Sequence, residues 1–116
     1  MHNELKKASN SHKMWSKQLE TLRGDLFGNQ VQRISVAEHL SSLKELRREA
    51  DKAGDFTTVS GATRAQNVMK RVLVNLLTDR TRIVGQLTVI GLEVRELKAR
   101  IIELDTALEN TNATQA

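Results

Sequence analysis

Histidine, cysteine and serine are the residue types from which a nucleophilic or metal site would be built, and this sequence offers few of them. His2, His12 and His39 have no metal-ligand spacing and no accompanying cluster of Asp and Glu. Cysteine is absent, which excludes thiol nucleophiles, Cys-ligated metals and disulfides. Ser35 and His39 lie one helical turn apart, but no glycine-flanked nucleophile elbow surrounds Ser35. We therefore expect a protein that is not an enzyme and that holds no metal or cofactor.

Basic side chains are the remaining candidates for a functional site. Arg64, Arg71 and Arg82 are separated by seven and eleven residues, so on a helix they form one stripe roughly 27 Å long. Such a stripe could follow a phosphate backbone, where contacts give affinity without sequence information. The alternative is a solvated face whose arginines pair with acidic groups of the preceding helix. The residues predicted to bind DNA are Lys6, Lys13, Lys17, Arg64, Lys70, Arg71 and Arg82.

The charge of the chain is moderately basic and unevenly distributed. Its 18 Lys and Arg residues against 14 Asp and Glu residues give a net charge of +4. The net charge is +3 for residues 1–33, −1 for residues 34–60, +5 for residues 61–102 and −3 for residues 103–116. Two basic zones are thus separated by a nearly neutral segment, and either could meet phosphates or an acidic partner.

Composition points to long helices. The 116 residues include no proline, six glycines and only three aromatic side chains. Proline is the residue that most reliably breaks helices, so its absence fits an all-α chain and argues against a β-sandwich. No secretory signal is visible, and charged residues interrupt the most apolar stretch, 72–94. We therefore expect a cytoplasmic protein that does not interact with membranes.

The first helix is predicted over residues 3–24, because apolar residues spaced alternately by three and four lie on one face of a helix. This stripe consists of Leu5, Ala8, His12, Trp15, Leu19, Leu22 and Leu26. Two glycines and an Asn in residues 24–30 predict a turn after it. The chain thus divides into an N-terminal basic amphipathic helix and turn, 1–33, and a remainder, 34–116.

A second helix is predicted from Val36. Ser35 and Glu38 have the spacing of a capping box, and apolar residues Val36, Leu40, Leu43, Leu46 and Ala50 would then share one face. Gly54 stands where a helix end favours a left-handed residue, and Asp55 where the next helix needs a cap.

The strongest periodicity belongs to the last half of the chain. From Met69 to Leu108, the spacing between apolar residues alternates between four and three without a break. This pattern is a heptad seam, and Arg80 is its one non-apolar member. It predicts a helix over residues 56–108, roughly 80 Å long, that so small a monomer could not cover. The seam residues predicted to drive homo-oligomerisation are Leu73, Leu76, Arg80, Ile83, Leu87, Ile90, Val94, Leu97, Ile101 and Leu104.

Residues beside this seam refine the prediction. Val72, Leu77 and Val84 widen its first half, which suits contact with more than one neighbouring helix. Gly85 and Gly91 would allow close approach of helices or mark a bend. Arg80 would set the register or the oligomeric state.

Residues 43–56, LKELRREADKAGDF, are followed by Ala62 and Ala65. This stretch resembles the helical-hairpin region of bacteriophage terminase small subunits. The resemblance covers about 40 residues, from Ser35 to Leu76. It implies a ring-forming, non-catalytic subunit that recognises viral DNA and regulates a large motor subunit in the host cytoplasm. The family's N-terminal helix-turn-helix domain has no counterpart here, because only one helix precedes the hairpin.

Together these patterns predict an all-α, homo-oligomeric protein. An antiparallel helical hairpin with one long coiled-coil helix would form its body, and an N-terminal amphipathic helix would pack against the base. The predicted function is DNA recognition and packaging as a non-catalytic subunit. The alternatives are a coiled-coil scaffold, adaptor or assembly protein without nucleic acid, and a regulator whose N-terminal helix docks into another protein.

Overall fold

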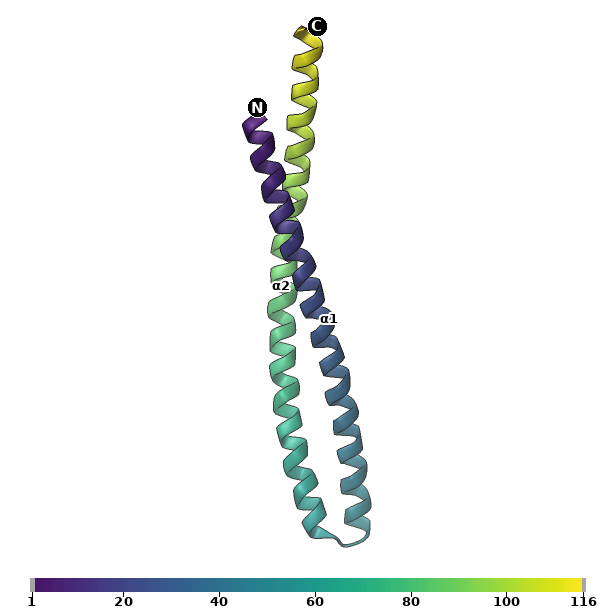
Figure 1. The fold of residues 1–116 in the computed structure, drawn as a ribbon. Coiled ribbons are helices and arrows are strands. Elements are labelled where there is room, and N and C mark those ends of the chain that lie inside the picture. The colour runs from purple at the N-terminus through teal and green to yellow at the C-terminus, as the bar shows by residue number, and fades with distance from the viewer. Residues whose placement is uncertain (1, 116) are drawn as a thin grey trace. The chain divides into compact units, whose positions relative to one another are not determined.

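The chain is all-α, as predicted. A computed structural model describes residues 2–115 and contains two helices, α1 (His2–Lys52) and α2 (Phe56–Gln115), joined by a turn at residues 53–55 (Figure 1). Helix α2 begins at Phe56 as predicted and continues beyond the predicted end at Leu108. Neither helix, over the described residues, has a stretch long and apolar enough to cross a membrane.

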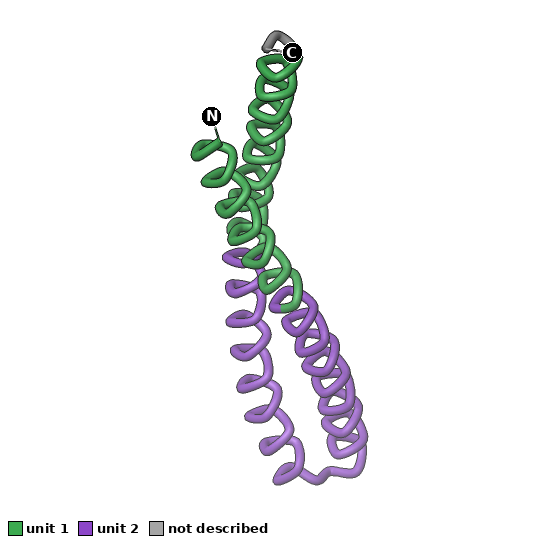
Figure 2. The backbone as a smooth tube through the Cα atoms, turned by 45° about the horizontal axis from the view of Figure 1, so that its top comes forward, with its two compact units in different colours: residues 1–24, 84–116 green, residues 25–83 purple. Residues whose placement is uncertain are grey.

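Two compact units make up the structure, and each contains part of both helices (Figure 2). Unit 1 consists of residues 1–24 and 84–116, and unit 2 of residues 25–83. In unit 1 an ion pair joins Arg100 Nη2 to Glu4 Oε2 at 3.9 Å. In unit 2 Asn29 Nδ2 donates to the carbonyl oxygen of Leu76 at 2.9 Å. These contacts fix the antiparallel register of the two helices within each unit.

The turn predicted at residues 24–30 and the helix start predicted at Val36 are wrong, because α1 is continuous from His2 to Lys52. Ser35 lies inside the helix and caps nothing. Glycine costs a helix interior only about 1 kcal/mol relative to alanine, so two glycines can be outweighed by packing. This part of α1 packs against α2, since Leu26 and Val36 are half-buried and Asn29 is buried on the face toward α2.

Asn29 explains why a residue type that favours turns is tolerated here. Its side chain donates to Leu76 of α2, and its Oδ1 accepts a hydrogen bond from Arg33 Nε at 2.8 Å. A buried amide that is satisfied on both its donor and its acceptor side avoids the penalty for burying polar groups. The Asn therefore joins the two helices in unit 2 instead of ending one of them.

The two helices pack against each other through their apolar faces. These faces include the apolar stripe of residues 5–26 on α1 and the seam on α2. Every member of the stripe is buried or half-buried, with Ala8 and Leu22 the most enclosed. On α2 the same holds from Met69 to Leu108 except at Arg80, which is exposed. Ile83 and Leu104 retain only 4% and 6% of their accessible surface.

The seam is partly covered by α1 of the same chain, which corrects the argument that one chain could not cover it: Ile83 and Leu104 are buried, and the other apolar members are half-buried. That argument assumed a first helix of about 22 residues, whereas α1 has 51. Residues 25–52 of α1 pack against the seam in unit 2, and residues 2–24 pack against it in unit 1. Arg80 can occupy a seam position because its long side chain extends from the apolar face into water.

Both caps of the connecting turn are confirmed. Gly54 has φ of +71°, and the amides of Gly54 and Asp55 donate to the carbonyls of Asp51 and Ala50 at 3.1 and 2.9 Å. This pair of bonds is a Schellman motif, which satisfies the last carbonyls of α1. Asp55 then accepts from the backbone amide of Thr58 through Oδ1 at 3.1 Å and from its hydroxyl through Oδ2 at 2.6 Å.

We expect the Asp55 cap to make stability depend on pH. The hydrogen bonds from the hydroxyl and amide of Thr58 lower the pKa of Asp55 from its usual 3.8. Because the folded pKa is depressed, the stabilisation is fully present above the usual pKa and is lost as the pH falls through the folded value. Thermal unfolding of Asp55→Ala should thus show a lower Tm than wild type at pH 7, with the difference shrinking toward pH 2. An equal difference at both pH values would contradict a charged cap.

We expect Gly28→Ala to stabilise the protein, because a Cβ at Gly28 would meet nothing within 4 Å. Alanine in a helix interior should raise the free energy of unfolding by about 0.5–1 kcal/mol. Gly54→Ala is the matched control and should destabilise, since its positive φ strains an L-residue. Urea denaturation measures both, and loss of stability in Gly28→Ala would show that α1 is not continuous there.

Candidate nucleic-acid and assembly interface

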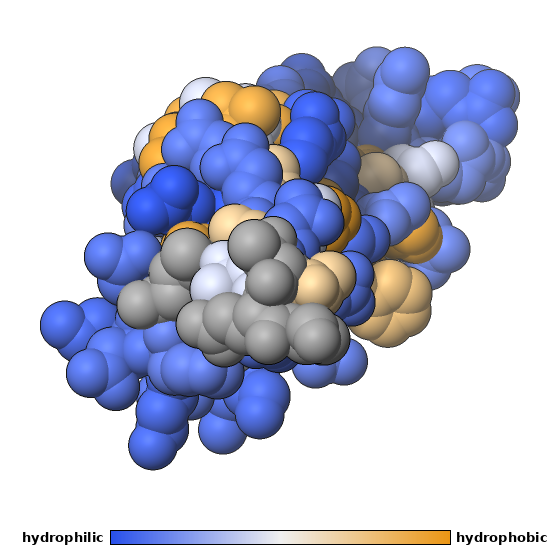
Figure 3. Space-filling model, turned by 90° about the horizontal axis from the view of Figure 1, so that it is seen from above, coloured by the Kyte–Doolittle hydropathy of each residue, from blue (hydrophilic) through white to orange (hydrophobic). Residues whose placement is uncertain are grey.

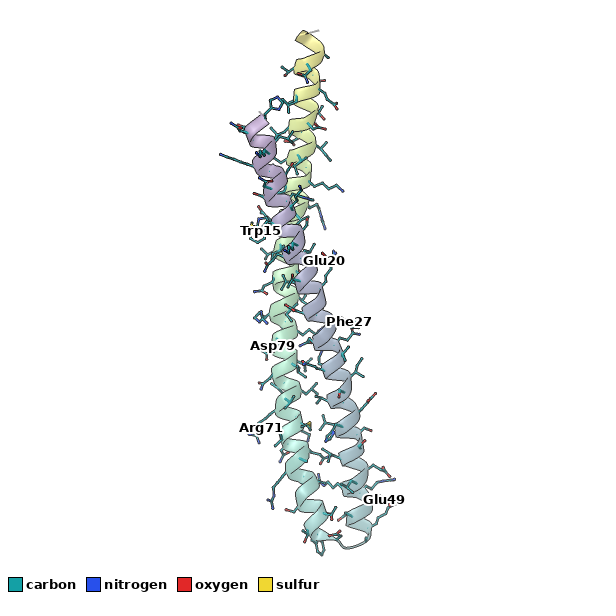
Figure 4. All side chains as sticks on the ribbon, in the orientation of Figure 1. Trp15, Glu20, Phe27, Glu49, Arg71 and Asp79 are labelled. Carbon is teal, nitrogen blue, oxygen red and sulfur yellow. The ribbon has the colours of Figure 1, made fainter. Side chains whose placement is uncertain are left out.

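The arginine stripe of α2 belongs to unit 2 and faces away from α1. Arg64, Arg71 and Arg82 are exposed, and Figure 4 shows Arg71 pointing away from α1. Arg64 Nη2 is held 3.3 Å from Ser60 Oγ one turn earlier. Over residues 56–83, α2 carries five basic residues and a single acidic one, Asp79. This part of α2 is therefore strongly basic along its outer face.

Two carboxylates of α1 in unit 2 have partners on their own helix. In unit 2 Glu45 and Glu49 form ion pairs with Arg48 on their own helix. The hydrogen bond from Arg48 lowers the pKa of Glu45. Figure 4 shows Glu49 pointing away from α2. These two acids thus engage an arginine of α1.

The predicted basic residues fall into two groups. Lys6, Lys13 and Lys17 are exposed on α1 in unit 1, on the side opposite the buried stripe. Arg64, Lys70, Arg71 and Arg82 are exposed on α2 in unit 2. Within unit 2, Lys70 lies about a third of a turn away from the arginines, on the edge of α2 nearest to α1.

A groove between α1 and α2 in unit 2 was missed by sequence reasoning. It has a volume of about 750 Å³, and four basic residues and one carboxylate contribute to its lining. Arg47 Nη1 donates to Gln66 Oε1 across it at 3.4 Å. The residues that line it are Leu40, Ser41, Lys44, Arg47, Arg48, Asp51, Val59, Gln66 and Lys70. Sequence patterns could not reveal this groove, because spacing along one helix does not show which residues of another helix lie opposite.

Apolar side chains also remain outside the seam. Phe27, Val31 and Ile34 are 68%, 49% and 52% exposed, and their spacing of four and three places them on one face of α1 in unit 2. We call these three residues the outer patch. Figure 4 shows Phe27 pointing away from α2, and the space-filling view shows apolar residues interrupting a hydrophilic surface (Figure 3).

Other apolar positions add to this surface. Leu46, predicted to share the buried face of its helix, is instead 48% exposed. The residues that flank the seam, Val72, Leu77 and Val84, are 36%, 44% and 40% exposed. Of the two roles predicted for Gly85 and Gly91, close approach or a bend, close approach is not found within the chain, because a Cβ there would meet nothing within 4 Å. Apolar surface outside the seam is therefore available to a partner.

The candidate catalytic residues are not drawn together. His12 is half-buried in unit 1, and His39 is exposed in unit 2 beside the exposed Ser35. Among the residues that the structure describes, no group of three His, Cys, Asp or Glu side chains could hold a metal ion.

We expect Ile34→Lys to weaken self-association without reducing helix content. A charge in the outer patch opposes burial against another chain but disturbs no contact with α2. Gln30→Lys, which adds the same charge at an exposed position of the same helix, is the control. Sedimentation velocity of wild type and both variants measures the effect. An unchanged oligomer in Ile34→Lys would exclude the outer patch from the interface.

Comparisons with models of protein families, with curated proteins and with solved structures found no match for this chain.

Proposed function

We propose that the chain is a homo-oligomeric, non-catalytic subunit that binds double-stranded DNA, of the kind that terminase small subunits represent. Its partners would be further copies of itself, DNA and a large motor subunit, in the cytoplasm. The observation that carries the proposal is the outer face of α2 in unit 2, where Arg64, Arg71 and Arg82 are exposed and Asp79 is the only acidic residue of that segment.

A stripe of arginines on a rigid helix suits a phosphate backbone. Arginine binds phosphate through a planar set of donors, and its guanidinium stays charged at any physiological pH. Three arginines over about five helical turns would contact several phosphates without reading the bases. Binding should therefore be strongly dependent on salt and weakly dependent on sequence.

Self-association would use apolar surface beside the seam, because α1 covers part of that seam. The outer patch supplies such a surface on α1, and Val72, Leu77 and Val84 supply apolar surface on α2. Large apolar side chains that gather on one face of a small protein are typical of protein–protein interfaces. Residues 27–34 include Arg33 as their only charged residue, so this part of α1 would tolerate burial on both faces.

The second candidate is a structural scaffold, adaptor or assembly protein that does not bind nucleic acid. The outer patch favours it, since an exposed Phe27 and its neighbours need a protein partner whether or not DNA is bound. In this case the basic stripe would only keep the outer face of α2 in solvent.

We expect Arg64→Glu/Arg71→Glu to abolish DNA binding at low salt while oligomerisation is retained. The double variant replaces two positive charges by negative ones on the acid-poor face, so attraction to phosphate becomes repulsion. Fluorescence anisotropy with a labelled duplex, measured at several salt concentrations, follows the binding.

The control is Arg95→Glu/Lys98→Glu, which makes the same charge change on the same helix in unit 1. Loss of binding in the first variant alone supports a specific face of α2. Equal loss in both would mean that only net charge matters. Absence of binding by wild type at low salt, with an intact oligomer, would favour the scaffold.

A further inference from the structure

We infer that the groove between α1 and α2 in unit 2 binds phosphate groups, and that a nucleic-acid backbone passes from the arginine stripe over Lys70 into this groove. The inference depends on the proposed function for its polymer, but the groove's affinity for phosphate can be measured without DNA. It assigns a role to Lys44 and Arg47 of α1, which lie outside the DNA-binding residues predicted from the sequence.

The charges of the groove favour an anion. Lys44, Arg47, Arg48 and Lys70 contribute four positive charges to its lining, against one negative charge from Asp51. Arg48 is already engaged by Glu45 and Glu49, so its charge is largely compensated. Lys44, Arg47 and Lys70 remain as the cations that an anion would meet. Because the groove lies between two helices, a bound phosphate would be less screened by water than on a flat surface.

Asp51 indicates where in the groove the phosphate would bind. It lies one helical turn beyond Arg47, toward the connecting turn at residues 53–55. Repulsion from this carboxylate disfavours an anion at that end. The preferred position is therefore between Lys44 and Lys70, with Arg47 beside them.

Arg47 is also preorganised for this task. Its Nη1 donates to Gln66 Oε1 of α2, which holds the guanidinium across the groove and leaves its other N–H groups available for an anion. A guanidinium whose position is fixed before binding loses less conformational freedom when the ligand arrives. The neutral amide of Gln66 provides this support without cancelling the positive charge.

Lys70 connects the groove to the arginine stripe. It lines the groove and also a second, smaller hollow of about 270 Å³ that Arg71, Val74 and Asn75 complete. Arg71 belongs to the stripe, so Arg71, Lys70 and the cations of α1 form one basic path around α2. A volume of about 750 Å³ is more than one phosphate ion fills.

Pyrophosphate is the probe that tests the groove alone. We expect a saturable titration in a ¹H–¹⁵N NMR spectrum, with the largest shifts at Lys44, Arg47, Gln66 and Lys70. Lys44→Gln/Arg47→Gln should abolish this titration with unchanged helix content. Lys52→Gln/Lys98→Gln, which removes two positive charges from positions outside the groove, should retain it. Uniform small shifts of all basic residues, or an unaltered titration in the groove variant, would overturn the inference.

Salt dependence of duplex binding tests the place of the groove in the proposed function. Each lost phosphate contact lowers the slope of log K against log[salt] by about 1, so the groove variant should lose about two units relative to wild type. The control pair should lose less than half of that. If wild type binds DNA and the groove variant keeps the full slope, the groove inference fails while the proposed function stands. If wild type binds pyrophosphate in the groove but no DNA, the proposed function fails and the groove remains a site for a small phosphorylated ligand.

Discussion

The burial of one apolar face of α2 against one apolar face of α1 is the interaction on which the rest of the structure depends. Most of the stability of helices in proteins comes from packing of an apolar face, so the contact between these helices of 51 and 60 residues is their main support. Leu22 in unit 1 and Ile83 in unit 2 are among the most enclosed side chains of this contact. With the seam turned toward α1, the arginine stripe of α2 and the outer patch of α1 remain exposed.

The sequence predicted α2 well because its signal is local and regular. The seam from Met69 to Leu108, the left-handed Gly54 and the cap at Asp55 each follow from residue types at fixed spacing, and each is found in the structure. The same reasoning failed over residues 24–35, where glycine and asparagine favour a turn locally. There the bond from Asn29 to Leu76, between residues 47 apart in the chain, outweighs local preference, and no pattern within α1 could predict it.

The functional surfaces were predictable only in part, for the same reason. The arginine stripe lies on one helix, so spacing alone could find it. The groove needs Lys44 and Arg47 of α1 to face Gln66 and Lys70 of α2, which requires the register between the helices. The outer patch was missed because Phe27 stood in a segment assigned to a turn. The missed outer patch thus traces to the false break in α1, and correcting that break adds an exposed face of α1 to the candidate assembly surfaces.

The most direct test of this account is whether α1 covers the seam within one chain. A 1:1 mixture of isotopically labelled and unlabelled protein distinguishes nuclear Overhauser effects within a chain from those between chains. We predict effects between the Asn29 side-chain amide and the residues around Leu76 within single chains, and their absence from the spectrum filtered for contacts between chains. Equally strong contacts between chains at these residues would show that a second copy fills the seam and would contradict the account.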